Sequence, residues 1–488
     1  MQNQALPESL QAGGGVPPAP QSRPPPSHAH SMPLALDQIR PRANSENHDI
    51  SMGSTYRENV TPGNCSYVAP WPIFAFDWCK WTVHGGSTPG GGAGGLGSAG
   101  KMAIGSYLED PHNFIQILDT QINQQDMNTS GGVPYGVEYV KVAEATCSYP
   151  VTRILWEPPS ASKQSDLLAT AGDHLRLWSL PNSSQASSQT LSNSINRTST
   201  ANQRGPPTAK LTPLALLSNS KTPEHTAPLT SLDWNQVSPK LIITSSIDTT
   251  CTIWDIPTLT AKTQLIAHDK EVFDVRFCAG SVDVFVSCGA DGSVRMFDLR
   301  SLEHSTIIYE PAEKPDPSKD TPPTPSRNSP TKTPATTSSS ATSHTLTTPP
   351  PLLRLASSPH DAHLLATFAA DSPIVRILDV RQPGQALLEL RGHSAAVNAV
   401  EWAPSRRGVL VTGADDCQVL GWDLLGGSGA ALDGPAQGGN VAAKGPMSAW
   451  KCDYEVSNLS WAPHSSLTGH GGEWVGVVGG RGVWGVKL

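Results

Sequence analysis

Three sets of His, Ser or Thr, and Asp recur along the chain, and these are the side chains of a nucleophilic hydrolase. Their spacing is constant: Ser or Thr follows the His by 19 residues and Asp follows it by 23. A fourth position, 29 residues after the His, holds Trp in two sets and Phe in the other. The sets are His225, Thr244, Asp248 and Trp254; His268, Ser287, Asp291 and Phe297; and His393, Thr412, Asp416 and Trp422.

The repetition indicates a structural role, because a catalytic constellation needs to occur only once in a chain. An indole, a hydroxyl, an imidazole and a carboxylate can form one hydrogen-bonded chain within a buried sheet. Phe297 has no indole nitrogen, so we expect a shorter network in the second set. The aromatic residue is followed by Asp in every set, as Asp255, Asp298 and Asp423. This is the Trp-Asp signature of a WD repeat.

The elements around these networks are short alternating runs such as 241–244 and 282–286, bounded by Gly, Asp, Asn and Pro, which predict strands. Weaker copies of the same template lie around 101–119, 166–178, 364–379 and 473–488, which brings the total to seven. The sequence therefore predicts an all-β fold, a seven-bladed WD-repeat β-propeller. We expect the segment 54–61 to supply the last strand of the seventh blade and so close the ring.

Low-complexity segments interrupt this pattern, and they collect much of the 43 Gly and 44 Pro residues. Such segments bury too little apolar surface to offset the entropy of ordering. We expect a disordered tail over 1–54 and a propeller over 55–488, which carries disordered insertions. The insertions are predicted at about 84–100, 181–207, 311–350 and 426–445.

Composition excludes several classes of function. A formal net charge of −8 leaves no broad basic surface, so we expect no direct binding of nucleic acid. The 8 cysteines form no C-x-x-C pair and the histidines lack metal-ligand spacing, so we expect no disulfide framework, metal or cofactor. Neither a signal peptide nor an apolar run of about 18 residues is found, which favours a soluble intracellular protein without membrane contact.

One glycine-rich motif could bind a nucleotide. The segment 95–101 matches G-x-G-x-x-G and the first seven positions of a P-loop. However, Met102 stands where Ser or Thr would hold Mg²⁺, and a strand rather than a helix is predicted to follow. We therefore interpret this segment as a linker. A propeller enzyme is also disfavoured, because the inner strands show no cluster of carboxylates and histidines.

Blades three and four resemble one particular family of WD-repeat scaffolds. The resemblance lies in APLTSLDWN (227–235), TSSIDTTCTIW (244–254), KTQLIAHDKEV (262–272), GADGSVRMFDLR (289–300) and EHSTIIYE (303–310). The family contains the animal adaptor of DYRK- and HIPK-type kinases, also described as a cullin-associated factor, and the plant anthocyanin and trichome regulator Transparent Testa Glabra. The resemblance implies a non-catalytic scaffold that joins a DYRK-like kinase or transcription factors in nucleus and cytoplasm. We expect a monomeric propeller.

Two Asp-x-Arg motifs indicate an alternative, the substrate receptor of a cullin-RING ubiquitin ligase. Asp298 with Arg300, and Asp379 with Arg381, follow the predicted third strands of neighbouring copies and resemble the D-x-R box of such receptors. Both motifs lack the Trp of the full box. An ordinary ion pair at the protein surface is the stronger explanation of these motifs, because an Arg at a strand end often pairs with a nearby Asp.

The proline-rich segment 311–350 carries a series of Ser/Thr-Pro dipeptides. Those considered for phosphorylation by a proline-directed kinase are Thr321, Thr324, Ser329 and Thr333. Arg327, two residues before Ser329, favours that serine. Each phosphate would add about −1.5 to −2 charges. Chance occurrence in a Pro/Ser/Thr-rich linker remains the alternative.

Overall fold

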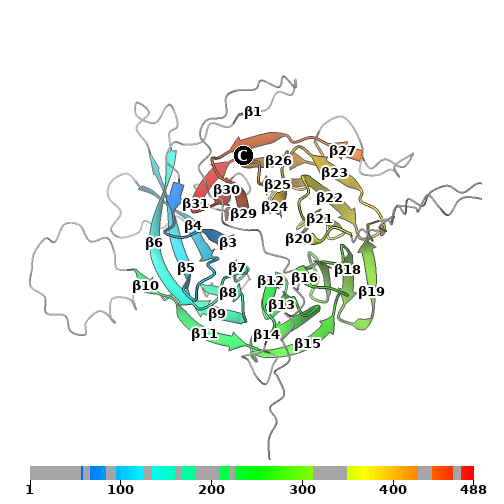
Figure 1. Cartoon of the computed structure of the whole chain (residues 1–488). Coiled ribbons are helices and arrows are strands. Elements are labelled where there is room, and N and C mark those ends of the chain that lie inside the picture. Colours follow the sequence, from blue (N-terminus) through cyan, green and yellow to red (C-terminus); the bar gives the residue numbers. More distant parts are fainter. Residues whose placement is uncertain are drawn as a thin grey trace, which may run out of the picture. The chain divides into compact units, whose positions relative to one another are not determined.

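The computed structural model describes ten parts of the chain: 57–58, 66–83, 95–124, 135–159, 166–181, 208–218, 226–311, 349–426, 442–464 and 474–488. The chain divides into two units, Met1–Met52 and Gly53–Leu488, and every described residue belongs to the second. The strands of the described parts form seven sheets, in which the consecutive strands of each blade pair antiparallel. No helix among the described residues is long and apolar enough to cross a membrane. The predicted all-β, seven-bladed propeller is confirmed (Figure 1).

Each sheet is one blade, and its strands follow one another from the centre of the ring outwards. Blade 1 contains β3 (Ile73–Trp78), β4 (Gly95–Ser106), β5 (Asn113–Gln124) and β6 (Tyr135–Cys147). Blade 2 contains β7 (Arg153–Trp156), β8 (Leu167–Ala171), β9 (Leu175–Ser179) and β11 (Thr212–Leu217). Blade 3 contains β12 (Leu229–Trp234), β13 (Leu241–Ser246), β14 (Thr250–Asp255) and β15 (Thr260–Ile266).

Blades 4 to 7 repeat this order. Blade 4 contains β16 (Val272–Phe277), β17 (Val284–Gly289), β18 (Val294–Asp298) and β19 (Ser301–Tyr309). Blade 5 contains β20 (Leu352–Ser357), β21 (Leu364–Ala369), β22 (Ile374–Asp379) and β23 (Leu388–Arg391). Blade 6 contains β24 (Val397–Trp402), β25 (Val409–Ala414), β26 (Gln418–Asp423) and β28 (Ser448–Lys451). Blade 7 contains β29 (Val456–Trp461), β30 (Trp474–Gly479), β31 (Gly482–Lys487) and β2 (Ser66–Val68).

Strand β2 closes the ring, because it comes from the N-terminal side of blade 1 and pairs antiparallel with β31. Closure from the N-terminal side is as expected, but the choice of segment 54–61 was wrong. The strand lies further along the chain, where Tyr67 packs against the core. Within the predicted segment only β1 (Arg57–Glu58) is described, and it pairs parallel with β28 of blade 6.

Short strands also lie inside or beside the predicted insertions. Strand β4 begins at Gly95, so residues 95–100 belong to blade 1 and not to an insertion. Strand β27 (Ala442–Lys444) pairs parallel with β23 of blade 5, within the segment predicted as disordered. Strand β10 (Ala209–Lys210) pairs parallel with β6 just after another insertion. Backbone pairing at blade edges explains these corrections, since it depends little on side-chain composition. The remainder of the predicted insertions and of the 1–54 tail lies mostly outside the described residues.

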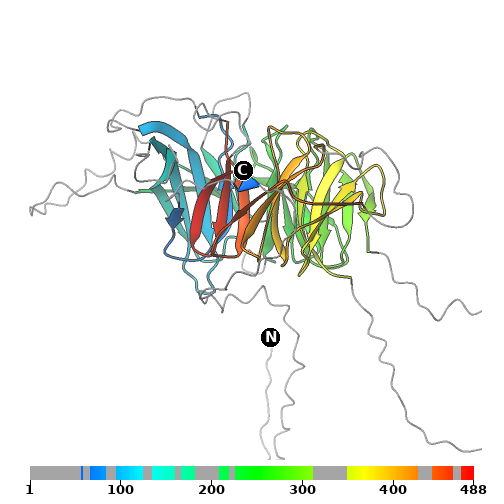
Figure 2. The same ribbon diagram turned by 90° about the horizontal axis from the view of Figure 1, so that it is seen from above.

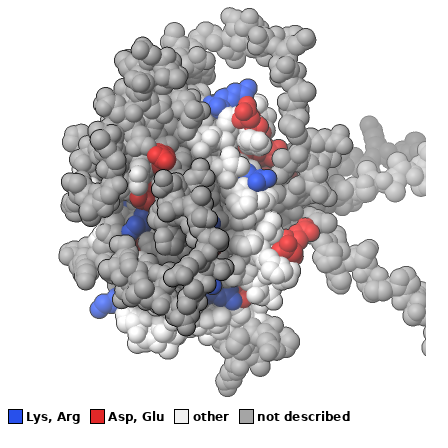
Figure 3. All heavy atoms as spheres, turned by 90° about the vertical axis from the view of Figure 1, so that its left-hand side faces the viewer, with Lys and Arg blue, Asp and Glu red and all other residues white. Residues whose placement is uncertain are grey.

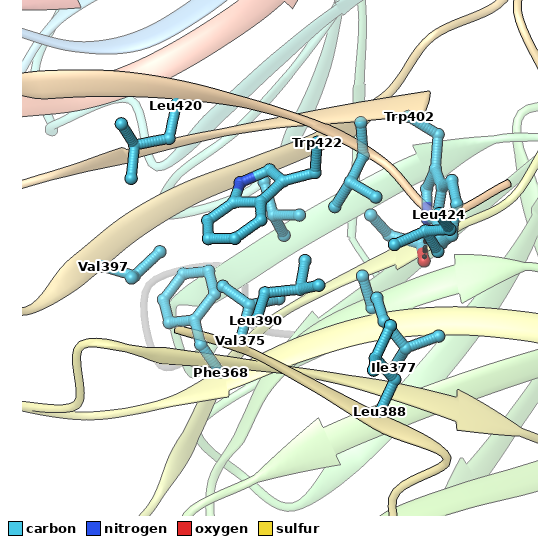
Figure 4. Close-up of a cluster of buried hydrophobic side chains, with 14 of the residues drawn as sticks. Phe368, Val375, Ile377, Leu388, Leu390, Val397, Trp402, Leu420, Trp422 and Leu424 are labelled. Atoms are coloured by element: carbon cyan, nitrogen blue, oxygen red, sulfur yellow. Dashed lines mark hydrogen bonds between the residues drawn. The ribbon is translucent and has the colours of Figure 1, made fainter. Parts of the chain in front are cut away.

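The hydrophobic core is divided among the contacts between neighbouring blades. Between blades 5 and 6, Phe368, Val375 and Leu390 pack against Val397 and Trp422 (Figure 4). Strand β21 is buried at every residue and β26 at its four central residues, because successive side chains point to opposite faces and both faces of a blade pack against neighbouring blades. Removing the ring of a buried Trp such as Trp422 typically costs about 3–5 kcal/mol. Figure 2 shows the blades from their edges, with strands running between the two faces of the ring.

Polar side chains on the inner strands join the blades. The carboxylate of Asp77 accepts the backbone N–H of Trp156 from the next blade at 2.9 Å. Asp233 accepts the N–H of Phe277 at 2.8 Å in the same way. Because a buried backbone N–H without a partner is costly, each such carboxylate fixes the register of adjacent inner strands.

Candidate protein interaction face

The four predicted residues of blade 6 form one hydrogen-bonded chain. Nδ1 of His393 lies 3.0 Å from Oδ2 of Asp416, and Nε2 lies 2.7 Å from Oγ1 of Thr412. The indole N–H of Trp422 donates to the same Thr412 oxygen at 2.9 Å. The Thr412 hydroxyl can therefore donate to Nε2 of His393 while Nδ1–H donates to Asp416.

Blade 4 contains the shorter version of this network. His268 lies 2.9 Å from Asp291 through Nδ1 and 2.7 Å from the Ser287 hydroxyl through Nε2. Phe297 donates nothing and instead stacks on Phe285, with ring centroids 5.0 Å apart. The polar chain thus ends at Ser287.

Blade 3 retains the outer half of the network, since Trp254 donates to Thr244 at 2.9 Å. Asp248 accepts from the backbone and hydroxyl of Thr250, and His225 lies outside the described residues. Blade 2 has the same indole-to-hydroxyl bond, from Trp178 to Thr170 at 3.0 Å.

The burial of these groups argues for a structural role. Ser287 and Thr412 are fully buried, so no substrate can reach either hydroxyl. Burial opposes ionisation of both Asp291 and Asp416, but hydrogen bonds outweigh it and lower the pKa of each carboxyl. The hydrogen bonds to Asp291 come from His268 and Ser293. The side-chain hydrogen bond to Asp416 comes from His393. The described residues contain no group of three or more potential metal ligands.

The P-loop-like segment is extended. Residues 95–101 lie in β4, which pairs along its length with β5. Lys101 is engaged by Asp166, with Nζ 3.1 Å from Oδ2. A strand paired on its backbone offers no cradle of N–H groups to a phosphate.

The two Asp-x-Arg motifs have the same geometry on neighbouring blades. In blade 4, Nη2 of Arg300 lies 2.6 Å from Oδ2 of Asp298, and Nε lies 2.9 Å from Oδ1. In blade 5, the corresponding distances from Arg381 to Asp379 are 2.6 and 3.0 Å. Both arginine side chains are mostly exposed, at 70% and 63%. Each aspartate therefore holds a guanidinium in a fixed orientation at the surface.

These motifs share one face of the ring. Antiparallel strands alternate in direction, so the turns after the first and third strands of every blade lie at the same end. This face also carries Arg407, which pairs with Asp361 of blade 5 at 2.6 Å and is 65% exposed. We call this end of the ring the arginine face. We define it by six exposed residues in the turns after the first and third strands: Val237, Leu259, Arg300, Arg381, Arg407 and Leu425.

The Arg407–Asp361 pair was missed because its members are 46 residues apart and lie on different blades. Each residue lies in the turn between the first and second strands of its blade, so an alignment of these turns between blades was the only sequence signal that could have predicted the pair. Elsewhere, the outer surface of blade 1 shows scattered charges of both signs among its described residues (Figure 3). The predicted phosphorylation sites Thr321, Thr324, Ser329 and Thr333 all lie outside the described residues.

Comparison with known families agrees with the repeat found in the sequence. The model of the WD domain, G-beta repeat, matches residues 218–255, 260–298 and 384–423. These spans carry the three clear copies of the His, Ser/Thr, Asp and aromatic pattern. The chain is therefore a WD-repeat propeller, a class that acts as a scaffold for other proteins.

Similar proteins extend this result to most of the chain. An uncharacterised WD repeat-containing protein of Schizosaccharomyces pombe is 37% identical, over 81% of this chain and 85% of its own length. The DDB1- and CUL4-associated factor 7 homolog of Dictyostelium discoideum is 37% identical, over 81% of this chain and 92% of its own. A WD repeat-containing protein of Saccharomyces cerevisiae is 38% identical, and the match spans 74% of this chain but 58% of that protein. The chain belongs to the WD-repeat family of DDB1- and CUL4-associated factor 7.

Proposed function

We propose that this protein is a non-catalytic scaffold that assembles complexes of a DYRK-like kinase or transcription factors in nucleus and cytoplasm. The arginine face carries the proposal. It presents three exposed arginines, each oriented by a carboxylate, on blades 4, 5 and 6. Exposed Val237, Leu259 and Leu425 accompany them. Arginine is one of the residue types that dominate binding energy at protein interfaces.

The part of the chain that the structure describes shows no catalytic constellation, and this supports the non-catalytic part of the proposal. In blades 4 and 6, the His and the Ser or Thr of each set are buried, and His, Ser/Thr and Asp are hydrogen-bonded to one another. The ring is closed within one chain by β2, and radial repetition leaves only short, protected sheet edges, which supports a monomer.

A second candidate function is that of a substrate receptor for a cullin-RING ligase. Two observations favour it: Arg300 and Arg381 repeat one geometry on adjacent blades, and a relative carries the name DDB1- and CUL4-associated factor 7 homolog. The two functions are compatible if a ligase and a kinase occupy different parts of the surface.

Affinity purification of the tagged full-length protein, followed by mass spectrometry, tests both candidates. The variant Arg300→Glu/Arg381→Glu removes the exposed cations of both motifs. Arg391→Glu is the matched control, since Arg391 is also exposed and paired with a carboxylate, that of Glu389. Selective loss of ligase subunits in the double variant supports the receptor function. Loss of a kinase or of transcription factors in the double variant but not in the control supports a scaffold that uses the arginine face. Recovery of none of these partners with the unaltered protein contradicts both proposals.

A further inference from the structure

Short parallel strands cover the outer edges of three blades. Strand β10 pairs with β6 of blade 1, β27 with β23 of blade 5, and β1 with β28 of blade 6. We call these added strands caps. Each cap belongs to the connection that precedes the outer strand of the following blade: β10 leads to β11, β27 to β28, and β1 to β2. The connection of one blade thus adds a strand to the edge of the blade before it.

The caps of blades 5 and 6 begin at equivalent positions. Strand β27 begins its pairing at Leu388, which lies opposite Ile377 of β22. Strand β1 begins its pairing at Ser448, which lies opposite Gly421 of β26. Ile377 and Gly421 each lie two residues before the Asp that ends the third strand. Because the two caps differ in sequence but not in place, the backbone of the blade edge selects them.

Blade 2 has no cap within the described part of the chain, and β11 is the last strand of its sheet. The equivalent place on β11 begins at Ala215, opposite Leu177, which lies two residues before the end of β9. The connection that would supply a cap is the turn 256–259 of blade 3. A hydrogen bond from the N–H of Leu259 to the carbonyl oxygen of Ile256, at 3.3 Å, closes this turn. So short a turn cannot reach the preceding blade.

The edge of β11 is apolar and uncharged. Leu214 and Leu216 are 52% and 51% exposed, whereas Leu217 packs in the core between blades 2 and 3. Sheet edges usually carry charges, prolines or bulges that oppose pairing with another chain. In β11, Pro213 and the bulge both precede Ala215, and the last three residues of the strand pair regularly with β9. This part of the edge therefore has none of these protections.

The neighbouring outer strands are better protected. In blade 4, the carbonyl oxygen of Ile308 on β19 already accepts the N–H of Gly384 at 2.8 Å. Gly384 lies in the connection before β23, which is the position from which the caps come. In blade 3, exposed Lys262 lies at a bulge of β15. Lysine and bulges both disfavour the addition of a strand. Strand β11 is thus the better site for a strand from outside.

We propose that the edge of β11 at 215–217 binds an extended segment of a partner protein, which adds to blade 2 as a parallel fifth strand. The direction follows the three caps, all of which are parallel. The partner segment lacks proline where it pairs, and its alternate apolar side chains pack on Leu214 and Leu216. This site goes beyond the proposed function, because it lies on the outer rim of the ring (Figure 1) and not in the turns of the arginine face.

Methyl NMR of the full-length protein with a defined peptide tests the proposal. The probe is an uncharged peptide of alternating Val and Thr between Gln residues. Its addition should shift the methyl signals of Leu214 and Leu216 and protect residues 212–217 from hydrogen exchange.

Substitutions test the same edge through the fluorescence anisotropy of the labelled probe. Leu214→Lys/Leu216→Lys should weaken binding about tenfold or more, because it removes apolar contacts and adds charge to the edge. Ile266→Lys is the matched control, since Ile266 is an exposed residue of the outer strand β15. The control should bind the probe as the wild type does. Equal affinity of the double variant and the wild type would overturn the proposal.

Two methylated forms of the probe separate edge pairing from simple apolar contact. One form carries N-methyl groups on its Val residues and the other on its Thr residues. Successive N–H groups of an extended strand point to opposite sides, so only one form loses the donors that face β11. Loss of binding by one form alone supports the proposal. Equal binding by both forms, or no shift of the two leucine signals at the highest soluble probe concentration, contradicts it.

A second copy of this chain is the alternative occupant of the edge. Leucine shifts that depend on protein concentration without the probe, together with a dimer in analytical ultracentrifugation, would show that the edge pairs with itself. That result would overturn the proposal of a partner segment. None of these measurements involves Arg300 or Arg381, so their outcome is separate from that of the proposed function.

Discussion

Blades 4 and 6 solve the same packing problem with different side chains. In blade 6, Trp422 lies opposite Leu410 on the adjacent strand and donates a hydrogen bond to Thr412. In blade 4, Phe297 lies opposite Phe285 and stacks on it. Blades 2 and 3 follow blade 6, since Leu168 and Ile242 oppose Trp178 and Trp254. A large ring thus pairs with an aliphatic partner, whereas two medium rings pair with each other.

This comparison shows that Phe297 does more than omit the indole donor of the polar network, because its ring forms a cross-strand pair with Phe285. The imidazole, hydroxyl and carboxylate are kept in both blades, and only the indole is exchanged for ring stacking. Blade 4 also adds the Ser293 hydroxyl, which donates to Asp291 at 2.9 Å. The network of blade 4 tolerates the loss of the indole because Phe285 and Phe297 fill the volume, and Ser293 adds a hydrogen bond within the same blade.

The largest expected effect comes from the central hydroxyl. Thr412→Val should leave both Nε2 of His393 and Nε1 of Trp422 without a partner, at a cost of about 2–4 kcal/mol in the free energy of unfolding. Ser287→Ala should leave only Nε2 of His268 unpaired, at about 1–2 kcal/mol. Urea denaturation of both variants checks this. Equal losses would show that the indole of Trp422 contributes nothing to the network.

The second-largest effect on the free energy of unfolding should come from substitutions in the Phe285–Phe297 pair. Phe297→Trp places a larger ring against Phe285, and overpacking should cost about 1–3 kcal/mol despite the new donor to Ser287. Adding Phe285→Leu recreates the arrangement of blade 6 and should recover most of that loss. A double-mutant cycle by chemical denaturation measures the coupling between the two positions. Additive effects would contradict the proposed pairing of volumes.

The pH dependence should be similar in both blades. Burial opposes ionisation, but hydrogen bonds outweigh it and hold the pKa of Asp291 and of Asp416 below the ordinary value of about 4. Their contribution to stability is therefore complete above pH 4 and declines as the pH falls towards the lowered folded-state values. Asp291→Asn and Asp416→Asn should be less stable than wild type at pH 7, with a smaller difference at pH 3. A difference that stays constant with pH would rule out this linkage.

The propeller could be predicted from sequence because its repeat is written in residues of fixed spacing, such as His393, Thr412 and Asp416. The strand that closes the ring could not, since Ser66–Val68 carries no repeat signature and is selected by pairing with β31. The Asp-x-Arg pairs could be predicted because their members are two residues apart in the sequence, whereas Arg407 and Asp361 are 46 residues apart and lie on different blades.

The smallest effect on stability should come from the arginine face, which contrasts with the buried networks. Arg300 and Asp298 form a well-oriented pair, but both groups are open to solvent, where water competes for each charge. Arg300→Ala should therefore leave the free energy of unfolding unchanged within error, as measured by urea denaturation. The same variant should weaken capture of any partner that uses this face. A measurable loss of stability would instead indicate that the pair belongs to the framework of blade 4, and the repeated motif would then support the fold and not an interface.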